Sequence, residues 1–353
     1  MNQGRHLRVT KECVTDAGAK SARMKIVTPG TIVLSYKLSI GKVGFVRTPM
    51  FTNEAIAALA NLDADVWPDY MYWALQHMDL LEGADRAAMG ITLNKAKLEQ
   101  LRVPLPPLPE QRRIAAILDK ADALRAKRRE AIAKLDQLLQ SVFLDMFGDA
   151  VTNLKGWQIV EVGTLVIDGP QNGLYKPASD YGTGTPILRI DGFRAGDVID
   201  RLPPKRLRLD QAEIAKYRLR PADLVINRVN SPEHLGKPAL IGALSEDVVF
   251  ESNMMRLSLD QDRVSPRYLL KCLLQKSVRD QISKRRKDAV NQSSINQTDV
   301  GTLTIPLPPI AMQKKFAAIV DAVSKQQVRI EAATHAVGSM LGSIQQAAFS
   351  GAF

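Results

Sequence analysis

The sequence has only two cysteines, Cys13 and Cys272, which are far apart and have no further ligand at metal-binding spacing. This excludes a disulfide-stapled scaffold and a zinc ribbon and is typical of the reducing cytosol, so we expect a cytoplasmic chain. No run approaches the roughly 18 apolar residues that a membrane helix needs, and residues 1–10 lack the apolar stretch of a signal peptide. We therefore expect no membrane partner.

The motifs of common catalytic and cofactor sites are also missing. The four histidines stand alone, and no His-x-x-x-His or Cys-x-x-Cys pair offers a metal site. Gly41-Lys42 has no upstream glycine and is followed by Val43, which excludes a phosphate-binding loop, and no Gly-x-Ser-x-Gly elbow occurs. We therefore expect no catalytic residue and no metal site. A nuclease or methylase with an unrecognised site is the alternative.

The sequence does have a positive charge balance. Lys and Arg number 48 against 37 Asp and Glu, which gives a formal net charge of +11. The excess is spread over the chain, with no basic tail. Such a distributed field suits a polyanion such as nucleic acid, but many basic proteins never bind one.

The most informative feature is an internal repeat. The segment VPLPPL at Val103–Leu108 returns 202 positions later as IPLPPI at Ile305–Ile310. At the same distance, QRRIAAILD at Gln111–Asp119 becomes QKKFAAIVD at Gln313–Asp321. Chance could supply one proline-rich hexamer but hardly both segments in register. The sequence therefore predicts a duplicated domain.

The likeness continues upstream with small insertions. PGTIVLS at Pro29–Ser35 matches PADLVIN at Pro221–Asn227, and this alignment places Met1 opposite Phe193. The second copy thus has an opening segment, Gly156–Asp191, that the first copy lacks. We expect that about 35–40 residues are missing before Met1, through an internal start or a truncated gene. The alternative is that the first copy simply begins differently.

After each proline-rich stretch, apolar residues recur at the alternating three- and four-residue spacing of a heptad. These residues would form an apolar seam along one side of a helix. Such a seam needs a partner helix, and the other copy offers one in the same chain. An ordinary helix lying on its own domain is the alternative. Each seam has one polar breach, Arg128 or Gln326, and a charge at Leu124 should destabilise the first. The expected seam residues, which also serve partner docking, are Ile114, Ile117, Leu124, Leu135, Leu138 and Val142, then Phe316, Ile319, Val323, Ile330, Val337, Met340 and Ile344.

The remaining segments predict two small α+β domains. Short helices are expected at Pro68–Met78 and Pro266–Arg279. Short β-branched runs bounded by Gly, Pro, Asn and Asp are typical of strands. The expected strands are Thr31–Tyr36, Val43–Arg47, Ile187–Ile190, Leu224–Arg228, Ala239–Leu244 and Met254–Leu259.

Candidate DNA-binding side chains gather in loops beside these strands. Arg, Lys, Asn and Gln bond base edges in the major groove, and Lys and Ser or Thr bond phosphates. An ordinary solvated surface is the alternative, above all for the run Lys284–Lys287. In the second copy the candidates are Tyr175, Lys176, Arg189, Arg194, Arg228, Asn230, His234, Lys237, Lys284, Arg285, Arg286, Asn291 and Gln292. In the first copy they are Tyr36, Lys37, Lys42 and Asn53.

Two globular parts, each followed by Leu-Pro-Pro-Leu/Ile and a long heptad helix, resemble the specificity subunit of type I restriction–modification systems. Pro104–Asp119 and Pro306–Asp321 are similar to its two conserved regions, and Asn94 and Asn296 lie where its domains end. Trp157 opens what resembles a complete second target recognition domain. The resemblance covers nearly the whole chain, and the repeated Pro-rich and heptad block is its most specific part.

The resemblance implies an α+β fold in which two target recognition domains are separated by a pair of long antiparallel coiled-coil helices. The first recognition domain, without its opening strands, spans residues 1–103, and the first conserved helical region spans 104–149. The complete second recognition domain spans 155–303, and the second conserved helical region spans 304–353.

The resemblance also implies a function and partners. In this family each recognition domain reads one half of a bipartite double-stranded DNA target, and helix length sets the unread spacer. The subunit catalyses nothing; it docks two methyltransferase subunits and, in the assembly, restriction subunits that translocate DNA. We expect no cofactor in this chain, with S-adenosylmethionine, ATP and Mg²⁺ on the partner subunits. The alternatives are a truncated, inactive or half-site-only subunit, and a coiled-coil adaptor that binds proteins alone.

Overall fold

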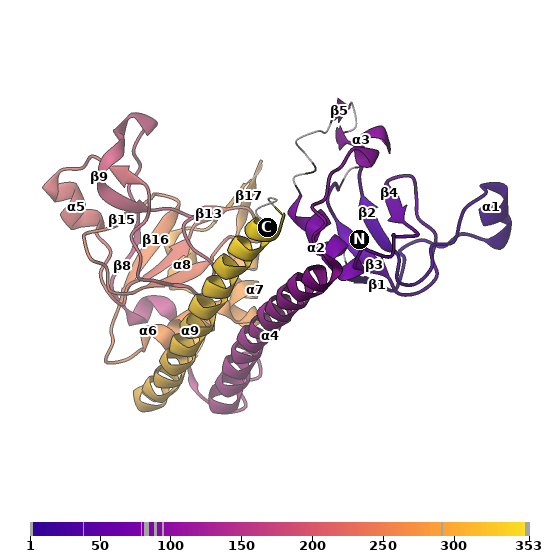
Figure 1. Ribbon diagram of the computed structural model, residues 1–353. Helices are drawn as coiled ribbons and strands as arrows, with labels where there is room; N and C mark the ends of the chain where they lie inside the picture. The colour runs from indigo at the N-terminus through magenta and orange to yellow at the C-terminus, as the bar shows by residue number, and fades with distance from the viewer. Residues whose placement is uncertain are drawn as a thin grey trace. The chain divides into compact units, whose positions relative to one another are not determined.

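The computed structural model describes residues 3–37, 39–78, 80, 85–87, 90–93, 95–290 and 292–349, and the chain divides into two units (Figure 1). Unit 1 comprises residues 1–132 and 329–353, and unit 2 comprises residues 133–328. Each unit contains a globular part and one end of each long helix, α4 (Leu108–Phe147) and α9 (Ile310–Phe349). Within the described ranges, no helix combines the length and apolar character needed to span a bilayer.

Both globular parts mix short helices with short strands. That of unit 1 contains β1 (His6–Leu7), α1 (Asp16–Ser21), β2 (Ile32–Ser35), β3 (Val43–Val46), β4 (Ile56–Leu59), α2 (Pro68–His77), β5 (Asp85–Ala87), β6 (Gly90–Thr92) and α3 (Lys95–Glu99). That of unit 2 contains β7 (Gln158–Glu161), η1 (Val162–Leu165), β8 (Val166–Asn172), η2 (Ala178–Asp180), β9 (Tyr181–Leu188), β10 (Val198–Ile199), β11 (Arg206–Leu207), α5 (Gln211–Tyr217), β12 (Leu224–Asn227), β13 (Val229–Asn230), β14 (Pro238–Ile241), β15 (Val249–Phe250), β16 (Met254–Leu259), α6 (Pro266–Leu274), α7 (Lys276–Arg285), β17 (Lys287–Ala289), β18 (Gln292–Ser294), α8 (Gln297–Gly301) and β19 (Thr304–Leu307).

Each strand expected from the sequence overlaps an observed one, but the helix expected over Pro266–Arg279 is wrong as a single element. It is divided into α6 and α7 at Gln275, whose backbone is extended (φ −68°, ψ 146°). The Gln275 side chain donates to the carbonyl of Lys271, so a local side-chain bond replaces continuation of the helix.

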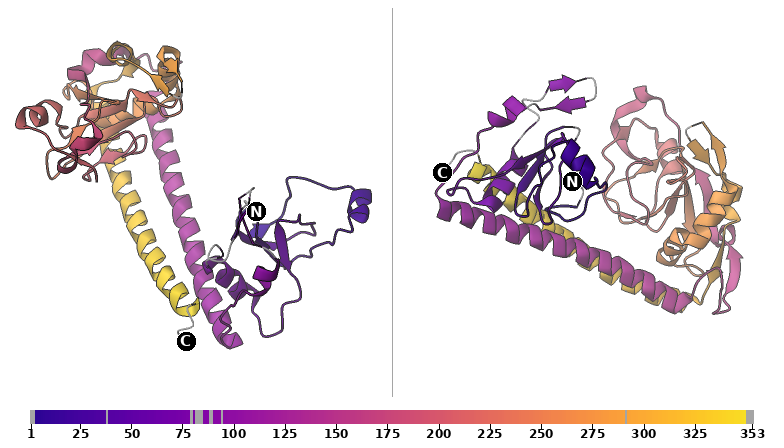
Figure 2. Two further views of the ribbon diagram at one scale, coloured as in Figure 1. Left: turned by 90° about the horizontal axis from the view of Figure 1, so that it is seen from above. Right: turned by 90° about the vertical axis from the view of Figure 1, so that its right-hand side faces the viewer.

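The internal repeat of the sequence is also found in the order of the strands, and Figure 2 shows strands in both globular parts. Unit 1 has a four-stranded sheet in the order β1-β3-β2-β4, and unit 2 a five-stranded sheet in the order β10-β14-β12-β16-β8. In each, a two-residue strand runs parallel to its neighbour, His6↔Phe45 in unit 1 and Val198↔Leu240 in unit 2, and the other neighbours are antiparallel. The additional strand of unit 2, β8, lies beside β16.

A buried glutamine at the start of each long helix ties the helix to its globular part. In unit 1, Gln111 accepts a hydrogen bond from the backbone N–H of Trp67 (2.7 Å) and donates to the carbonyls of Asp65 and Pro106 (both 2.8 Å). In unit 2, Gln313 makes the three equivalent bonds, to Ser265 N, Arg263 O and Pro308 O. Because both glutamines are almost fully buried, losing any of these bonds would leave a polar group unpaired.

Buried tyrosines form a second repeated anchor. The hydroxyl of Tyr70 donates to the carbonyl of Pro104, and that of Tyr268 to the carbonyl of Pro306, each at 2.7 Å. Burial raises the pKa of Tyr70 to about 12 and raises that of Tyr268 as well, so both phenols remain protonated donors. Carbonyl groups of the proline-rich stretch therefore accept hydrogen bonds from the domain that precedes it.

A third anchor is an arginine–aspartate pair whose arginine comes from different places in the two units. In unit 2, Arg267 binds Asp321 of α9 at 2.6 Å. The equivalent of Arg267 in unit 1 is Asp69, an acid, and Arg5 bridges it to Asp119 of α4 at 2.5 Å on each side. The helix aspartate thus keeps an arginine partner in both units.

The two long helices pack against each other within each unit. In unit 1, Ile114 and Leu118 of α4 share a core with Leu341 of α9. In unit 2, Phe143 of α4 meets Phe316 of α9 with ring centroids 5.5 Å apart. In each unit, therefore, the beginning of one helix lies beside the end of the other.

The predicted seam has the right period, but four of its thirteen residues are exposed and are wrong as seam positions. Leu124, Leu138, Ile319 and Met340 are 39, 50, 37 and 62 % exposed. The structure instead buries residues such as Leu118, Leu139 and Leu341, each one position after an expected seam position. Adjacent apolar pairs, such as Leu138-Leu139 and Met340-Leu341, allow both phases from the sequence, and the helices use the later residue.

Polar bonds join the two helices at one breach of the seam and beside the other. In unit 1, the guanidinium of Arg128 donates to the carbonyl of Ala333 at 2.6 Å. Gln326 is exposed, and its neighbour Gln327 donates to the carboxylate of Asp136 at 2.8 Å in unit 2. These hydrogen bonds join α4 to α9 where the apolar pattern of the seam is interrupted.

Candidate nucleic-acid interface

Unit 2 carries an open hollow of about 730 Å³ whose walls come from four segments of the chain. The segments lie between residues 174 and 182, at Arg189, at 204–206 and at 251–253. Four lining side chains are cationic and two are tyrosines: Lys176, Arg189, Lys205 and Arg206, with Tyr175 and Tyr181. Cations beside exposed rings are the side chains that contact phosphates and base edges.

The floor of the hollow forms where the end of β8 meets the turn between β15 and β16. Leu174 N donates to Phe250 O at 3.0 Å, and Ser252 N donates to Leu174 O at 2.9 Å. A Cβ atom at Gly173 would lie 2.3 Å from the carbonyl oxygen of Glu251. Only glycine allows the two backbones to approach this closely, so Gly173 sets the depth of the floor.

Most cations of the hollow are held by carboxylates. Lys176 binds Glu213 and Arg206 binds Glu246, each at 2.6 Å, and these hydrogen bonds raise the pKa of both cations. Lys205 is exposed and forms no ion pair within the residues that the structure describes. The hollow therefore combines fixed cations with one cation free to meet an anion.

Arg189 is positioned by a buried acid. The Glu251 carboxylate, 7 % exposed, accepts from the backbone N–H of Ile190 at 2.6 Å and lies 3.7 Å from Nη1 of Arg189. The same Nη1 donates to the Tyr181 hydroxyl at 3.3 Å, and Asp191 lies 3.6 Å from Nε. The guanidinium is thus fixed at the wall of the hollow, with Nη2 unbonded among the described residues.

A predicted DNA-binding loop adjoins the hollow. The Arg228 side chain donates to the carbonyl of Ser252 at 3.0 Å, and the backbone N–H groups of Arg228 and Val229 both donate to Asn253 O. Ile295 N donates to Arg228 O, which joins this loop to the residue that follows β18. Contacts therefore continue from the hollow through Arg228 to β18.

The hairpin of β17 and β18 extends this surface. β18 pairs with both β13 and β17, and the tip residue Val290 is 89 % exposed. At the base of the hairpin, Arg286 binds Asp288 at 3.1 Å. A short two-stranded ribbon of this kind is narrow enough to enter a DNA major groove.

Two further predicted DNA-binding cations, Lys237 and Arg285, are held by backbone carbonyls. Nζ of Lys237 donates to the carbonyls of Ile190 and Phe193, at 2.6 and 2.8 Å, and burial lowers its pKa. Arg285 donates to the carbonyls of Gln281 and Thr302, both at 3.1 Å. These bonds hold the loops in place, and a DNA contact by either side chain stays a prediction.

The other predicted residues lie apart from the hollow. Asn291 lies outside the described residues. The remaining candidates of unit 2, which are exposed or half-buried in loops and at strand and helix ends, are Arg194, Asn230, His234, Lys284 and Gln292. In unit 1, Tyr36 donates to Glu54 O at 2.8 Å, Nζ of Lys37 lies 5.6 Å from the centre of the Tyr36 ring, and Asn53 accepts from Ala55 N. Lys42, the fourth candidate of unit 1, is exposed.

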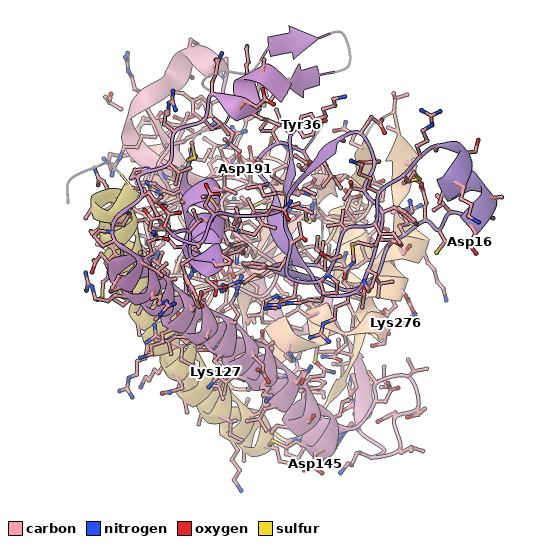
Figure 3. The ribbon with its side chains drawn as sticks, turned by 45° about the vertical axis from the view of Figure 1, so that its right-hand side comes forward. Asp16, Tyr36, Lys127, Asp145, Asp191 and Lys276 are labelled. Atoms are coloured by element: carbon pink, nitrogen blue, oxygen red, sulfur yellow. The ribbon has the colours of Figure 1, made fainter. Side chains whose placement is uncertain are left out.

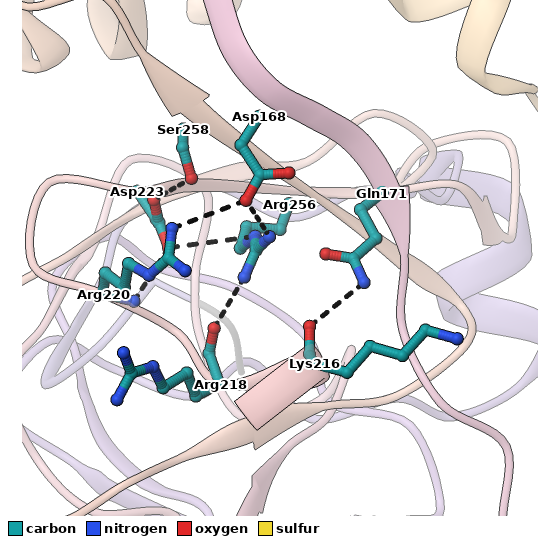
Figure 4. A network of polar contacts seen from close by, with 8 residues as sticks. All are labelled: Asp168, Gln171, Lys216, Arg218, Arg220, Asp223, Arg256 and Ser258. Carbon is teal, nitrogen blue, oxygen red and sulfur yellow. Dashed lines mark hydrogen bonds and ion pairs between the residues drawn. The ribbon is translucent and has the colours of Figure 1, made fainter. Parts of the chain in front are cut away.

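An ion network joins the strands of the unit 2 sheet (Figure 4). Arg256 of β16 is 2 % exposed; it binds Asp168 of β8 at 2.6 Å and donates to Arg218 O at 2.8 Å. Asp223 lies 4.0 Å from Arg256 and accepts from the Ser258 hydroxyl, and burial raises its pKa. The network fastens the edge strand β8, whose end forms the floor of the hollow.

Sequence reasoning missed several lining residues. Lys205, Arg206, Tyr181, Ser252 and Asn253 were not among the candidates, although Lys205-Arg206 follows a Pro-Pro turn in a dense run of cations. Nothing in the sequence indicates that these positions meet Tyr175 and Arg189. No cluster of three His, Cys, Asp or Glu side chains suited to a metal occurs in the described part of the chain.

Residues 10–134 and 155–337 match the family described as the type I restriction modification DNA specificity domain. The chain belongs to this family, which confirms the resemblance found in the sequence. It is 36 % identical over 169 residues to the MjaX specificity subunit of Methanocaldococcus jannaschii, which is 47 % of this chain and 39 % of that protein. It is 27 % identical over 353 residues to the StySPI specificity subunit of Salmonella potsdam, with 92 % of this chain and 75 % of that protein covered.

The fold has a solved counterpart. The crystal structure of the type I restriction–modification S subunit from M. genitalium matches with a TM-score of 0.60 at 15 % identity, covering 98 % of this chain and 88 % of that chain. A likeness at this identity shows the shared α+β architecture of two globular parts and long helices.

Proposed function

We propose that this chain is a specificity subunit that recognises a sequence in double-stranded DNA. The observation that carries this proposal is the duplicated anchoring of two globular parts on two long helices, through Gln111 and Gln313 and through Tyr70 and Tyr268. In unit 2, the anchored domain presents a hollow lined by cations and rings. The family to which the chain belongs supports the same reading.

We propose that each unit reads one half of a bipartite target. Unit 2 would read its half through the hollow, the Arg228 loop and the hairpin, and unit 1 through Tyr36, Lys37, Lys42 and Asn53. The two helices would form an antiparallel coiled coil that sets the distance between the halves. Each has 40 residues, which at about 1.5 Å per residue gives about 60 Å, nearly two turns of duplex.

The outward positions of the predicted heptads, which are exposed or half-buried, are our candidate for partner docking. Ile117, Leu124, Ala131 and Leu138 recur every seven residues and so share one face of α4. Their equivalents on α9 are Ile319, Gln326, Ala333 and Met340. Two such stripes, related by the internal repeat, suit two copies of one partner, and we propose that these are methyltransferase subunits. Figure 3 shows other exposed side chains along α4, among them Lys127 and Asp145.

The chain itself would catalyse nothing in this proposal. Its partners would supply the chemistry, with S-adenosylmethionine on the methyltransferase subunits and ATP with Mg²⁺ on restriction subunits. No described residue of this chain is assigned a catalytic role.

The test is to co-express the chain with the methyltransferase encoded beside it and to map methylated bases over the host genome by single-molecule sequencing. A methylated motif of two short halves separated by unread bases is the expected result. A motif with one half would mean that a single unit reads DNA. An absence of methylation by a stable, folded complex would contradict the proposal.

A further inference from the structure

Within the hollow of unit 2, the four cations differ in what they can bind. Lys205 has no carboxylate partner among the described residues, whereas Arg189 lies within 3.7 Å of two carboxylates, Glu251 and Asp191. A phosphate approaching Arg189 would also approach these acids, and the repulsion would offset much of the attraction. Arg189 is therefore poorly placed for a phosphate and better placed for a neutral acceptor.

The guanidinium of Arg189 still has donors to offer. Its Nη1 is engaged by the Tyr181 hydroxyl and Glu251, and its Nε is buried beside Asp191, while Nη2 makes no hydrogen bond to any residue that the structure describes. Nη2 carries two N–H groups, and the base edge that presents two adjacent acceptors in the major groove is the O6 and N7 pair of guanine. Both guanine atoms are uncharged acceptors.

We propose that Arg189 is a specificity-determining residue of unit 2 and that it reads a guanine, with Glu251 and Tyr181 as its positioning residues. The inference rests on the proposed function, because it names the base that the same surface recognises. Lys205, the unpaired cation of the same hollow, contacts a phosphate. Tyr175, 80 % exposed at the rim, packs beside the duplex.

The experiment selects bound sequences from a randomised duplex DNA pool with the full chain in complex with its methyltransferase subunits. Wild type is compared with Arg189→Lys, which keeps the charge but lacks the guanidinium that Tyr181 and Glu251 position, and with Arg189→Ala. We expect a guanine in one half of the wild-type motif and a loss of that preference by roughly 5- to 150-fold in both variants. The other positions of the motif should be unchanged.

Lys205→Ala is the matched control from the same hollow. It should select the wild-type motif, bind all sequences more weakly and reduce the slope of log affinity against log salt by about one. Thermal unfolding of every variant verifies that it is folded. If Arg189→Ala is unfolded, the comparison with wild type is made with Arg189→Lys alone.

The outcomes separate this inference from the function on which it rests. If both Arg189 variants select the wild-type motif, or lose affinity for all sequences alike with a flatter salt slope, Arg189 does not read a base. The proposed function would then stand. If folded wild-type complex selects no motif at all, the proposed function fails and the assignment of Arg189 fails with it.

Discussion

Gly30 and Ala222 are equivalent residues of the internal repeat, and both have left-handed backbone, with φ of 92° and 74°. A side chain in this region costs about 1–2 kcal/mol, part of which is offset because glycine loses more entropy on folding. A Cβ atom at Gly30 would meet no atom within 4 Å, so the cost there is one of backbone strain alone.

We therefore predict opposite effects at these two positions. Ala222→Gly should stabilise unit 2 by about 0.5–1 kcal/mol, and Gly30→Ala should destabilise unit 1 by a similar amount. Hydrogen exchange of backbone amides in each unit reports the two free energies separately. If both substitutions changed the unfolding free energy in the same direction, left-handed backbone strain would not be what the two equivalent positions have in common.

The second prediction at the residue scale concerns the buried network of Arg256. Arg256→Met would leave the buried Asp223 without its cation, and we expect a loss of about 3–5 kcal/mol in the unfolding free energy of unit 2. Arg220→Met is the control, since Arg220 is half exposed, contacts Asp168 only at 3.5 Å, and should cost under about 1 kcal/mol. Urea unfolding measures both. Equal losses would mean that the network does not hold the sheet.

At the scale of elements, the phase of the helix seam leads to a paired prediction. Leu118 is fully buried and Leu124 is 39 % exposed, although the sequence favoured Leu124 as a seam residue. Leu118→Glu should destabilise unit 1 by several kcal/mol because a carboxylate would be buried without a partner, whereas Leu124→Glu should cost under about 1 kcal/mol. Thermal unfolding of the two variants decides between the phases. A larger loss for Leu124→Glu would restore the phase predicted from the sequence.

These examples also explain what could be predicted at this scale. The strands were predictable because runs such as Leu224–Ile226 are apolar throughout and are buried on both faces. The seam period was predictable, but its phase was not, because Leu138-Leu139 offers two adjacent apolar residues and only packing selects one. The hollow could not be assembled from the sequence, since Tyr175, Arg189 and Lys205 come together through the close approach at Gly173 and the pairing of β9 with β11.

At the scale of the whole molecule, the repeat gives the chain two units that share their main anchoring residues but differ in others. Both units use the same glutamine and tyrosine anchors, yet the arginine that pairs with the helix aspartate is Arg5 in unit 1 and Arg267 in unit 2. Conserving the anchors while changing the domain surface is what a pair of reading modules on a common scaffold requires. The surfaces can then recognise different half-sites without altering how each module is held.

The last prediction follows from the same equivalence applied to the outside of the helices. Leu138 of α4 and Met340 of α9 are equivalent, and both are at least half exposed. Leu138→Glu and Met340→Glu should therefore fold normally, while each carboxylate would have to be desolvated in a docked complex. We expect each single variant to retain one methyltransferase subunit and the double variant to retain none, as measured by native mass spectrometry of the co-purified complex. Gln137→Glu and Ser339→Glu add the same charge one residue away, on exposed positions outside the stripe, and should retain both subunits. If all four single variants keep two subunits, the stripes are not the docking surface; if either control loses a subunit as readily as its neighbour, charge on the helix rather than the apolar stripe governs assembly.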